Sequence, residues 1–325
     1  MKRHLTLIAG SSSISLAEKV SKSLGVDITP IESKKFNDGE TYVKIERSVR
    51  GSHVFLVQST SPPVNDSLME LLIVADALKR ASAKEITAII PYFGYSRQDR
   101  KADSREPITA KLVADIIEKS GVDRVLTFDL HADQIQGFFD IPVDNLTALP
   151  ILARAALENK PKDIVVVAPD AGSVARARRL AKILYSDLAI IDKRRPAHGQ
   201  SKVVYLMGEV KGKNAILVDD IIDTAGTISS AAAELKKRGA KDVSICATHA
   251  VFSKDAIKKL SSSDIKEVII TDSIVLKEEN RIPKIRVVSI APYIAELINS
   301  IYAGESMGVI VKGKFEQVFE WSKKK

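Results

Sequence analysis

The chain alternates short apolar runs, rich in β-branched residues, with longer segments of helical spacing. The runs are candidate strands, and they begin at Leu5, Val54, Ile86, Arg124, Asp163, Leu188, Ala215, Val243, Glu267 and Arg286. Helical periodicity follows in the segments that start at Asn65, Ile108, Ser173 and Thr227, and the last of these ends at Gly239. This alternation predicts an α/β fold in which mainly parallel sheets have both faces covered by helices.

The length of the chain favours two domains. It has 325 residues, and a typical domain has roughly 150. Near the midpoint, Pro142 and Pro150 flank an expected helix start. We therefore expect a boundary near residue 145 and two similar α/β domains, each a mainly parallel sheet flanked by helices, over residues 1–145 and 146–325.

Composition narrows the classes of function. The net charge is +8 and the pI is about 9.3, but the positive charge is interspersed with acids and aromatic residues make up only 5%. This pattern favours small anionic ligands, and a nucleic-acid groove is a weaker hypothesis. No window approaches the roughly 18 apolar residues of a membrane span, so we expect a cytoplasmic protein that binds neither membrane nor nucleic acid. The single cysteine, Cys246, lies in an apolar run and is expected to be buried.

The most informative segment follows the expected strand at Ala215. The strand leads into Asp219 and Asp220, and a loop of small residues at 223–227 then opens onto a helix. Backbone N–H groups at a helix N-terminus suit a phosphate, and the two carboxylates suit the vicinal hydroxyls of a ribose. The segment is not a P-loop, because the GK[ST] ending is missing. Simple helix capping by Asp223 would explain one acid but not three acids and the loop.

This segment resembles the phosphoribosyl-pyrophosphate signature of two families, the type I phosphoribosyltransferases and the ribose-phosphate pyrophosphokinases. Other motifs distinguish the two: FNDGE at 36–40, RQDR at 97–100, DLHADQIQGFF at 129–139, and PDAGS and DKRR at 169–173 and 192–195. Ordinary phosphoribosyltransferases lack the first three. The resemblance also extends over nearly the whole chain, so it points to the ribose-phosphate pyrophosphokinase family.

The resemblance implies transfer of the β,γ-pyrophosphoryl group of ATP to the C1 hydroxyl of ribose 5-phosphate, which gives phosphoribosyl pyrophosphate and AMP. The implied catalytic residues are Lys193, Arg195 and His131. The implied ATP-binding residues are Phe36, Asp38, Gly39, Glu40, Arg97 and Gln98. The implied ribose 5-phosphate residues are Arg195, Asp219, Asp220, Asp223, Thr224, Ala225, Gly226 and Thr227. Mg²⁺ is the implied cofactor, with His131 and Asp170 beside it.

Each of these motifs also has a plainer interpretation when it is taken alone. NDG is an ordinary turn, RQDRK is a solvated charged loop, and a single histidine is more often structural than catalytic. The basic cluster at 193–195 follows an apolar strand, which favours an anion over a plain surface patch. Direct ligation of Mg²⁺ by His131 is doubtful, because this ion prefers oxygen ligands.

The resemblance further implies a homo-hexamer built from dimers, in which FNDGE completes a neighbour's active site. It also implies activation by inorganic phosphate and inhibition by ADP, with a regulatory phosphate site at Ser48, Arg50, Ser82 and Ser306. Two positions depart from the family pattern. Ala225 replaces a loop glycine, and Gly308 replaces a second serine of the regulatory segment, which makes this regulation uncertain.

Two alternatives remain open. The first is a catalytically silent homologue that regulates an active enzyme, although such a subunit would have no need of His131, Asp170, Lys193 and Arg195 together. The second is a phosphoribosyltransferase that consumes the same sugar, which would require a nucleobase and no ATP.

Overall fold

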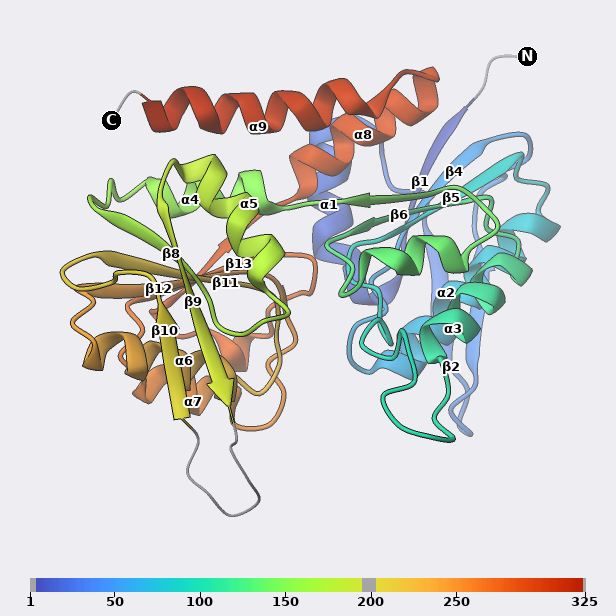
Figure 1. The fold of residues 1–325 in the computed structure, drawn as a ribbon. Coiled ribbons are helices and arrows are strands. Elements are labelled where there is room, and N and C mark those ends of the chain that lie inside the picture. The colour runs from blue at the N-terminus through green and yellow to red at the C-terminus, as the bar shows by residue number, and fades with distance from the viewer. Residues whose placement is uncertain (1–3, 195–202, 324–325) are drawn as a thin grey trace. The chain divides into compact units, whose positions relative to one another are not determined.

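The computed structural model describes residues 4–194 and 203–323, and they form two compact units (Figure 1). The first unit comprises Met1–Thr147, Ser273–Val275 and Ser289–Ile310, and the second comprises Ala148–Asp272, Leu276–Val288 and Val311–Lys325. The chain therefore returns to the first unit twice after leaving it, an arrangement that a single boundary at 145/146 does not describe. The main reason is helix α8 (Ala291–Ala303), which packs in the first unit.

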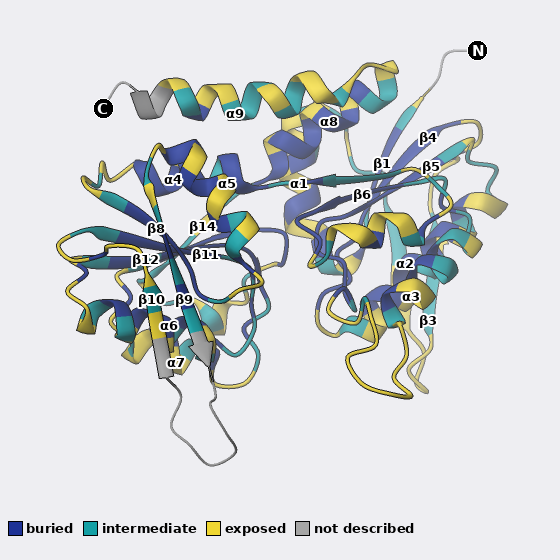
Figure 2. Ribbon diagram, viewed as in Figure 1, coloured by how far each residue is buried: buried dark blue, intermediate teal, exposed yellow. Residues whose placement is uncertain are grey.

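The first unit is built on a parallel sheet of five strands in the order β1-β4-β5-β6-β7. These strands are β1 (Leu5–Ala9), β4 (His53–Val57), β5 (Glu85–Ile90), β6 (Arg124–Phe128) and β7 (Val143–Leu146). The helices are α1 (Ile14–Leu24), α2 (Val64–Arg80), α3 (Thr109–Lys119) and α8, and the short 3-10 helices are η1 (Ser11–Ser13) and η2 (Asp133–Phe138). The central strands β4, β5 and β6 are buried almost throughout, as expected for a sheet that is covered on both faces (Figure 2).

Alternate side chains of each strand point to opposite faces of this sheet. Val125 of β6 belongs to a core cluster with Leu71 of α2 and Val113 of α3. Phe128, an odd number of residues further along the same strand, points the other way. Its ring meets that of Tyr293 from α8 edge-on, with 5.7 Å between ring centroids. Helices α1 and α8 pack against each other, so residues near the end of the chain complete the first unit's core.

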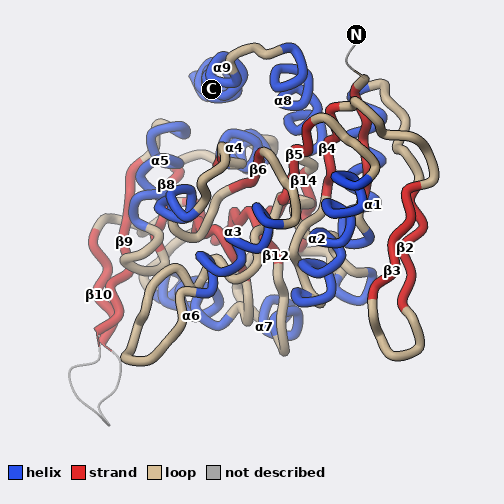
Figure 3. Tube along the Cα trace, turned by 90° about the vertical axis from the view of Figure 1, so that its right-hand side faces the viewer, coloured by secondary structure: helices blue, strands red, loops and turns tan. Residues whose placement is uncertain are grey.

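A separate antiparallel hairpin consists of β2 (Ile31–Lys35) and β3 (Thr41–Ile45). The tube view in Figure 3 shows this hairpin extended beside the helices of the first unit. Lys35 pairs with Thr41 at its end, so the FNDGE motif forms the hairpin turn. Neither β2 nor β7 is among the strands expected from the sequence.

The second unit contains a seven-stranded sheet in the order β10-β9-β8-β11-β12-β13-β14, parallel except for β10. Its strands are β8 (Ile164–Ala168), β9 (Asp187–Arg194), β10 (Val203–Met207), β11 (Asn214–Ile222), β12 (Asp242–Ala250), β13 (Glu267–Thr271) and β14 (Ile285–Val288). Its helices are α4 (Leu149–Leu157), α5 (Val174–Leu184), α6 (Gly226–Lys237) and α7 (Ala256–Ser262), with the 3-10 helix η3 (Glu278–Asn280). Helices α4 and α5 cover one face, and α6 and α7 cover the other (Figure 1). A last helix, α9 (Met307–Lys323), follows α8.

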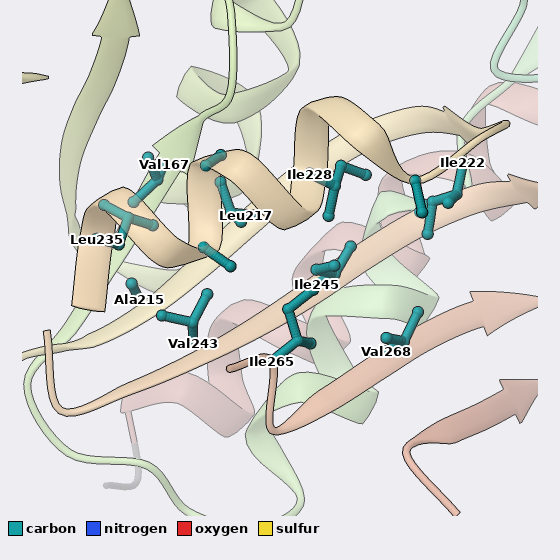
Figure 4. Packing of buried hydrophobic residues seen from close by; sticks show 14 of the residues in the cluster. Val167, Ala215, Leu217, Ile222, Ile228, Leu235, Val243, Ile245, Ile265 and Val268 are labelled. Carbon is teal, nitrogen blue, oxygen red and sulfur yellow. The ribbon is translucent and has the colours of Figure 1, made fainter. Parts of the chain in front are cut away.

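The core beneath α6 shows why this segment is a helix. Ile228 and Leu235, seven residues apart, lie on one side of α6 and face Leu217 and Ile245 of the sheet (Figure 4). All four side chains are at most 3% exposed. Apolar residues at this spacing share one face of a helix. Truncating one such buried leucine to alanine typically costs about 2–5 kcal/mol.

The strand order of the second sheet identifies where a ligand can bind. From β8 the chain runs outward to β9 and β10, and it then returns to β11 on the other side of β8. In open α/β sheets, a reversal of this kind leaves a crevice at the carboxyl ends of the two central strands. The residues at these ends are Asp170, after β8, and the segment 219–227 at the end of β11. Across the described ranges, no helix is long and apolar enough to span a membrane.

Candidate active site

The loop between β11 and α6 forms a small pocket. Helix α6 begins at Gly226, with Ala225 as its N-cap. A pocket of about 120 Å³ is lined by Asp170, Asp219, Ile221, Ile222, Asp223, Thr224, Ala225, Gly226, Thr227 and Ile228. The structure therefore brings together Asp170, Asp219 and the whole of the predicted phosphate loop. The pocket residues do not include Asp220, whose side chain is nearly fully buried.

Ala225 adopts the backbone conformation that usually requires glycine. Its φ is +58°, and its methyl group is 4% exposed within the core of the unit. A non-glycine residue in this left-handed region costs about 1 kcal/mol. The alanine keeps its backbone N–H, so the departure from the family pattern leaves the donor in place.

Arg176 neutralises the acid pair that follows β11. Its Nη1 lies 3.0 Å from Asp220 Oδ1 and 3.6 Å from Asp219 Oδ1. The backbone N–H of Asp220 donates to Asp219 Oδ1 at 3.0 Å. The Arg176 side chain is only 16% exposed, so the charges interact in a partly dehydrated environment where they are strongly coupled.

The environment favours the protonated form of Asp219. Burial, and then the adjacent Asp220, raise the pKa of Asp219 to about 8, although Arg176 acts in the opposite direction. An acid in this state can both accept and donate hydrogen bonds. Its side chain is therefore suited to neutral hydroxyl groups such as those of a sugar.

Ser253 fixes the first residue of the phosphate loop. Its hydroxyl donates to a carboxylate oxygen of Asp223, and its N–H donates to the Asp223 carbonyl at 3.1 Å. Phe252 and Lys254, on either side of it, both have positive φ, +47° and +52°. Lys259 of α7 donates to the carbonyl of Thr224 at 3.2 Å. The loop is thus held in place by hydrogen bonds from the segment that follows β12.

Asp170 is held rigidly at the end of β8. Its Oδ1 accepts a hydrogen bond from the N–H of Ser173 at 3.0 Å, and the Ser173 hydroxyl donates to the Asp170 carbonyl at 3.0 Å. Ser173 is 2% exposed. Over the described residues, no group of three or more His, Cys, Asp or Glu side chains is arranged to hold a metal ion. A cation at Asp170 would need further ligands from substrate or water.

In the first unit, two predicted motifs meet at the carboxyl ends of β5 and β6. These strands are parallel neighbours, so the loops that follow them are adjacent. Gln134 Nε2 donates to Asp99 Oδ2 at 2.7 Å and joins the two loops. Arg97 and Gln98 are exposed after β5, and His131 is exposed after β6. The three predicted polar side chains therefore lie on one edge of the sheet.

The FNDGE turn carries an exposed aromatic ring at its first residue. The N–H of Phe36 donates to the Glu40 carbonyl at 2.8 Å, and the N–H of Glu40 donates to Asp38 Oδ1 at 3.1 Å. Gly39 has a φ of +95°, which glycine adopts without strain. The Phe36 ring is half exposed and touches Tyr42 edge-on, with 5.7 Å between centroids. An exposed ring of this kind can stack on a planar base.

Two family models match the chain: the N-terminal domain of ribose phosphate pyrophosphokinase over residues 5–121, and the phosphoribosyl synthetase-associated domain over residues 196–312. A ribose-phosphate pyrophosphokinase of Fusobacterium nucleatum is 53% identical, over 94% of this chain and 97% of its own. That of Bacillus caldolyticus is 52% identical, over 95% and 98%. The crystal structure of phosphoribosylpyrophosphate synthetase from Mycobacterium smegmatis has a TM-score of 0.88 at 44% identity and covers 93% of this chain and 100% of its own.

The chain belongs to the ribose-phosphate pyrophosphokinase family. The resemblance and the α/β fold expected from the sequence are confirmed, and the protein is a transferase. The matches span both units, so membership does not rest on a shared loop alone.

Lys193 and Arg195, which have predicted catalytic roles in this pyrophosphokinase family member, lie on either side of the point where the described residues end. Lys193 is in β9, where its backbone pairs with Val204 of β10. Strand β9 is adjacent to β8, which leads to Asp170. Arg195 lies outside the described residues. Their roles stay predictions.

The predicted regulatory residues of the pyrophosphokinase lie in the first unit, in two places. The N–H of Gly51 donates to the Ser82 carbonyl at 2.8 Å, which brings the loop that carries Ser48 and Arg50 next to Ser82. Ser306 lies at the start of α9, where its hydroxyl accepts a hydrogen bond from the N–H of Gly308 at 3.3 Å. The regulatory assignment remains a prediction.

Sequence reasoning missed Arg176, Ser253 and Lys259. Arg176 carried a detectable signal, because it shares the buried face of α5 with Leu180 and Ile183 at helical spacing. A cation on such a face needs a buried partner. Ser253 and Lys259 carried no comparable signal, since their contacts join segments far apart in the chain.

Proposed function

We propose that the enzyme transfers the β,γ-pyrophosphoryl group of ATP to the C1 hydroxyl of ribose 5-phosphate and releases AMP. The observation that carries this proposal is the pocket at the switch point of the second sheet. It combines a helix N-terminus, two threonines and a partly protonated acid within about 120 Å³. That combination suits a phosphate joined to a polyol.

The loop 223–227 would hold the 5-phosphate through its backbone N–H groups and the hydroxyls of Thr224 and Thr227. The dipole of α6 favours an anion at its first turn. Asp219 would bind the ribose hydroxyls. Asp220 would act indirectly, because it is buried against Arg176 and its negative charge offsets that of the guanidinium beside Asp219.

Mg²⁺ is the proposed cofactor, and Asp170 is the residue most suited to hold it. Mg²⁺ is usually bound through one or two carboxylates together with substrate phosphates and water. The donor set suits this mode, since the Asp170 carboxylate is oriented by Ser173 at the carboxyl end of β8. When bound, the ion would neutralise charge on the transferred phosphates. His131 offers a nitrogen ligand, so a proton-transfer or orienting role is better suited to it than metal ligation.

The residues proposed to bind ATP are Phe36, Asp38, Gly39, Glu40, Arg97 and Gln98. Phe36 would stack on the adenine, and the forked guanidinium of Arg97 would bind phosphate oxygens. Lys193 and Arg195 would neutralise charge that develops during transfer. Positioning and electrostatics suffice for such a reaction, which requires little covalent chemistry from the protein. A hexameric assembly and control by inorganic phosphate and ADP remain proposals of the same kind.

The decisive experiment is a product analysis with Mg²⁺, ATP and ribose 5-phosphate. We expect AMP and phosphoribosyl pyrophosphate in equal amounts, resolved by chromatography. Lys193→Ala should abolish this turnover, whereas Lys22→Ala, an exposed lysine of α1, should not. Formation of ADP would mean an ordinary sugar kinase. ATP binding without turnover would favour a silent regulatory homologue.

A further inference from the structure

The second unit has another pocket, at the opposite edge of its sheet. Its volume is about 310 Å³, and it lies at the amino ends of β8, β11, β12 and β13. Asn214 of β11 lines this pocket, whereas Asp219 of the same strand lines the phosphate-loop pocket. At about 3.3 Å per residue, the two residues are roughly 17 Å apart along the strand. The two pockets are therefore separate.

The rim of this pocket carries an excess of positive charge. Four lysines line it, at 160, 162, 241 and 266, with two acids, Asp242 and Glu267. Both acids are already paired: Asp242 with Lys266 at 2.6 Å, and Glu267 with Arg286 at 2.7 Å. Within the described ranges, none of the ion pairs involves Lys160, Lys162 or Lys241. Three like charges thus border one cavity, and an anion would relieve their repulsion.

The loop that carries Lys160 and Lys162 is held in a strained conformation. Lys160 and Asp163 both have positive φ, +47° and +49°. A non-glycine residue in this region is strained, and the conformation persists only where the surroundings enforce it. Asn214 holds the end of the loop, because its Nδ2 donates to the Lys162 carbonyl at 2.6 Å and its N–H donates to the Asp163 carbonyl at 2.9 Å, and the N–H of Lys160 donates to the Leu157 carbonyl at 2.9 Å. The rim is therefore organised before any ligand arrives.

The opposite rim is anchored in a similar way. The N–H of Lys241 donates to the Lys213 carbonyl at 2.8 Å, and Lys236 Nζ donates to the Lys241 carbonyl at 2.7 Å. Ile216 and Ile269, which are at most 3% exposed, are among the lining residues. The lining is mixed: its charged groups lie beside Pro161, an apolar residue that is only half-buried. A volume of about 300 Å³ is at the lower end of the size range of small-molecule sites.

We propose that this pocket binds a small phosphorylated molecule, with its phosphate between Lys160, Lys162 and Lys241 and its apolar part against Pro161. The two carboxylates are neutralised within the protein, so they do not repel the phosphate. The pocket lies away from the residues proposed for catalysis, so the proposal does not depend on the reaction assigned to the enzyme.

Phenyl phosphate is a suitable probe, since it combines a phosphomonoester with an apolar ring. We would titrate it by calorimetry into the full-length protein and into Lys160→Gln/Lys162→Gln. The expected result is an affinity at least about ten-fold lower in the double variant. Lys22→Gln/Lys119→Gln removes the same charge from exposed positions in the first unit, and it should bind as the wild type does. Lys241→Gln tests the opposite rim independently and should weaken binding as well.

Three results would overturn the proposal. The first is equal affinity in the double variant and the wild type. The second is binding that survives in the lysine variants but disappears in Thr224→Val/Thr227→Val, because the probe would then be bound to the phosphate loop. The third is displacement of the probe by a short oligonucleotide with steep salt dependence, which would indicate a polyanion surface. Turnover with ATP and ribose 5-phosphate, measured alongside, reports separately on the proposed reaction and on the folding of each variant.

Discussion

The hydroxyl of Ser253 donates to a carboxylate oxygen of Asp223, 30 residues earlier in the chain. The backbone N–H of the same serine donates to the Asp223 carbonyl at 3.1 Å. The segment after β12 therefore determines both the position of the phosphate loop and the orientation of its first carboxylate. Ser253 is a positioning residue, since it acts through Asp223.

Replacing Ser253 with alanine should weaken sugar-phosphate binding more than it slows turnover. Loss of one hydrogen bond to a charged acceptor costs about 1.5–3 kcal/mol, which corresponds to roughly ten- to 150-fold. We expect the KM for ribose 5-phosphate to rise by about that factor, with kcat changed less than three-fold. Ser253→Thr, which keeps the hydroxyl, should restore the KM. Ser262→Ala, in an exposed helical position, is the matched control, and an equal effect there would contradict the assignment.

Removing the charge of Arg176 should destabilise the second unit. The variant Arg176→Met leaves Asp219 and Asp220 without their buried cation, and breaking such a pair costs about 3–5 kcal/mol. Urea denaturation measures the free energy of unfolding directly. Arg238→Met breaks an ion pair on α6 whose arginine is 38% exposed, where less than about 1 kcal/mol is expected. Losses of similar size in the two variants would contradict a structural role for Arg176.

Asp219 should make the stability of the protein depend on pH in a defined direction. Its pKa is raised to about 8 in the folded chain from 3.8, so between these values the folded state holds a proton that the unfolded state has lost. Stability should therefore decrease as pH rises through this window, by at most about 1.4 kcal/mol per pH unit, and level off above it. Denaturation at several pH values would show the slope.

The same slope should flatten in Asp219→Asn, because the amide does not titrate. The exposed Asp264→Asn is the control and should keep the slope. An unchanged slope in Asp219→Asn would mean that this carboxyl is not the group that titrates.

Cys246 should resist alkylation in the folded protein. It is fully buried in β12, and burial raises the pKa of its thiol to about 12. The thiolate is the reactive form, so little is present at neutral pH. Iodoacetamide followed by mass spectrometry should give no adduct under native conditions and full modification in urea. Rapid native alkylation would show that β12 opens.

Most strands could be predicted because the feature that produces them, a short apolar run, is local in the sequence. All ten expected runs overlap strands of the two sheets, since buried parallel strands require continuous apolar segments. The strands that were missed include β2, with the polar sequence IESKK, and β7, with only four residues. Their pairing depends on a hairpin turn and a neighbouring strand, and neither leaves an apolar signature.

The motifs of the candidate site are also local in the sequence, so 223–227 and Asp170 could be predicted from the sequence. The residues that orient them could not be predicted in this way. Arg176 and Ser253 reach the acids from α5 and from the segment after β12. Such contacts depend on how the sheet is assembled, and the residues that make them are separated by tens of positions in the chain.

The packing of Tyr293 against Phe128 has a consequence for biosynthesis. A ribosome makes Phe128 long before it makes α8, so the nascent first unit emerges with one face of its sheet covered by α1 but not yet by α8. It can reach its final packing only after α8, and therefore most of the second unit, has been translated. Exposed surface of this kind promotes aggregation of nascent chains, and a polypeptide that stops after residue 147 would leave that face permanently without α8.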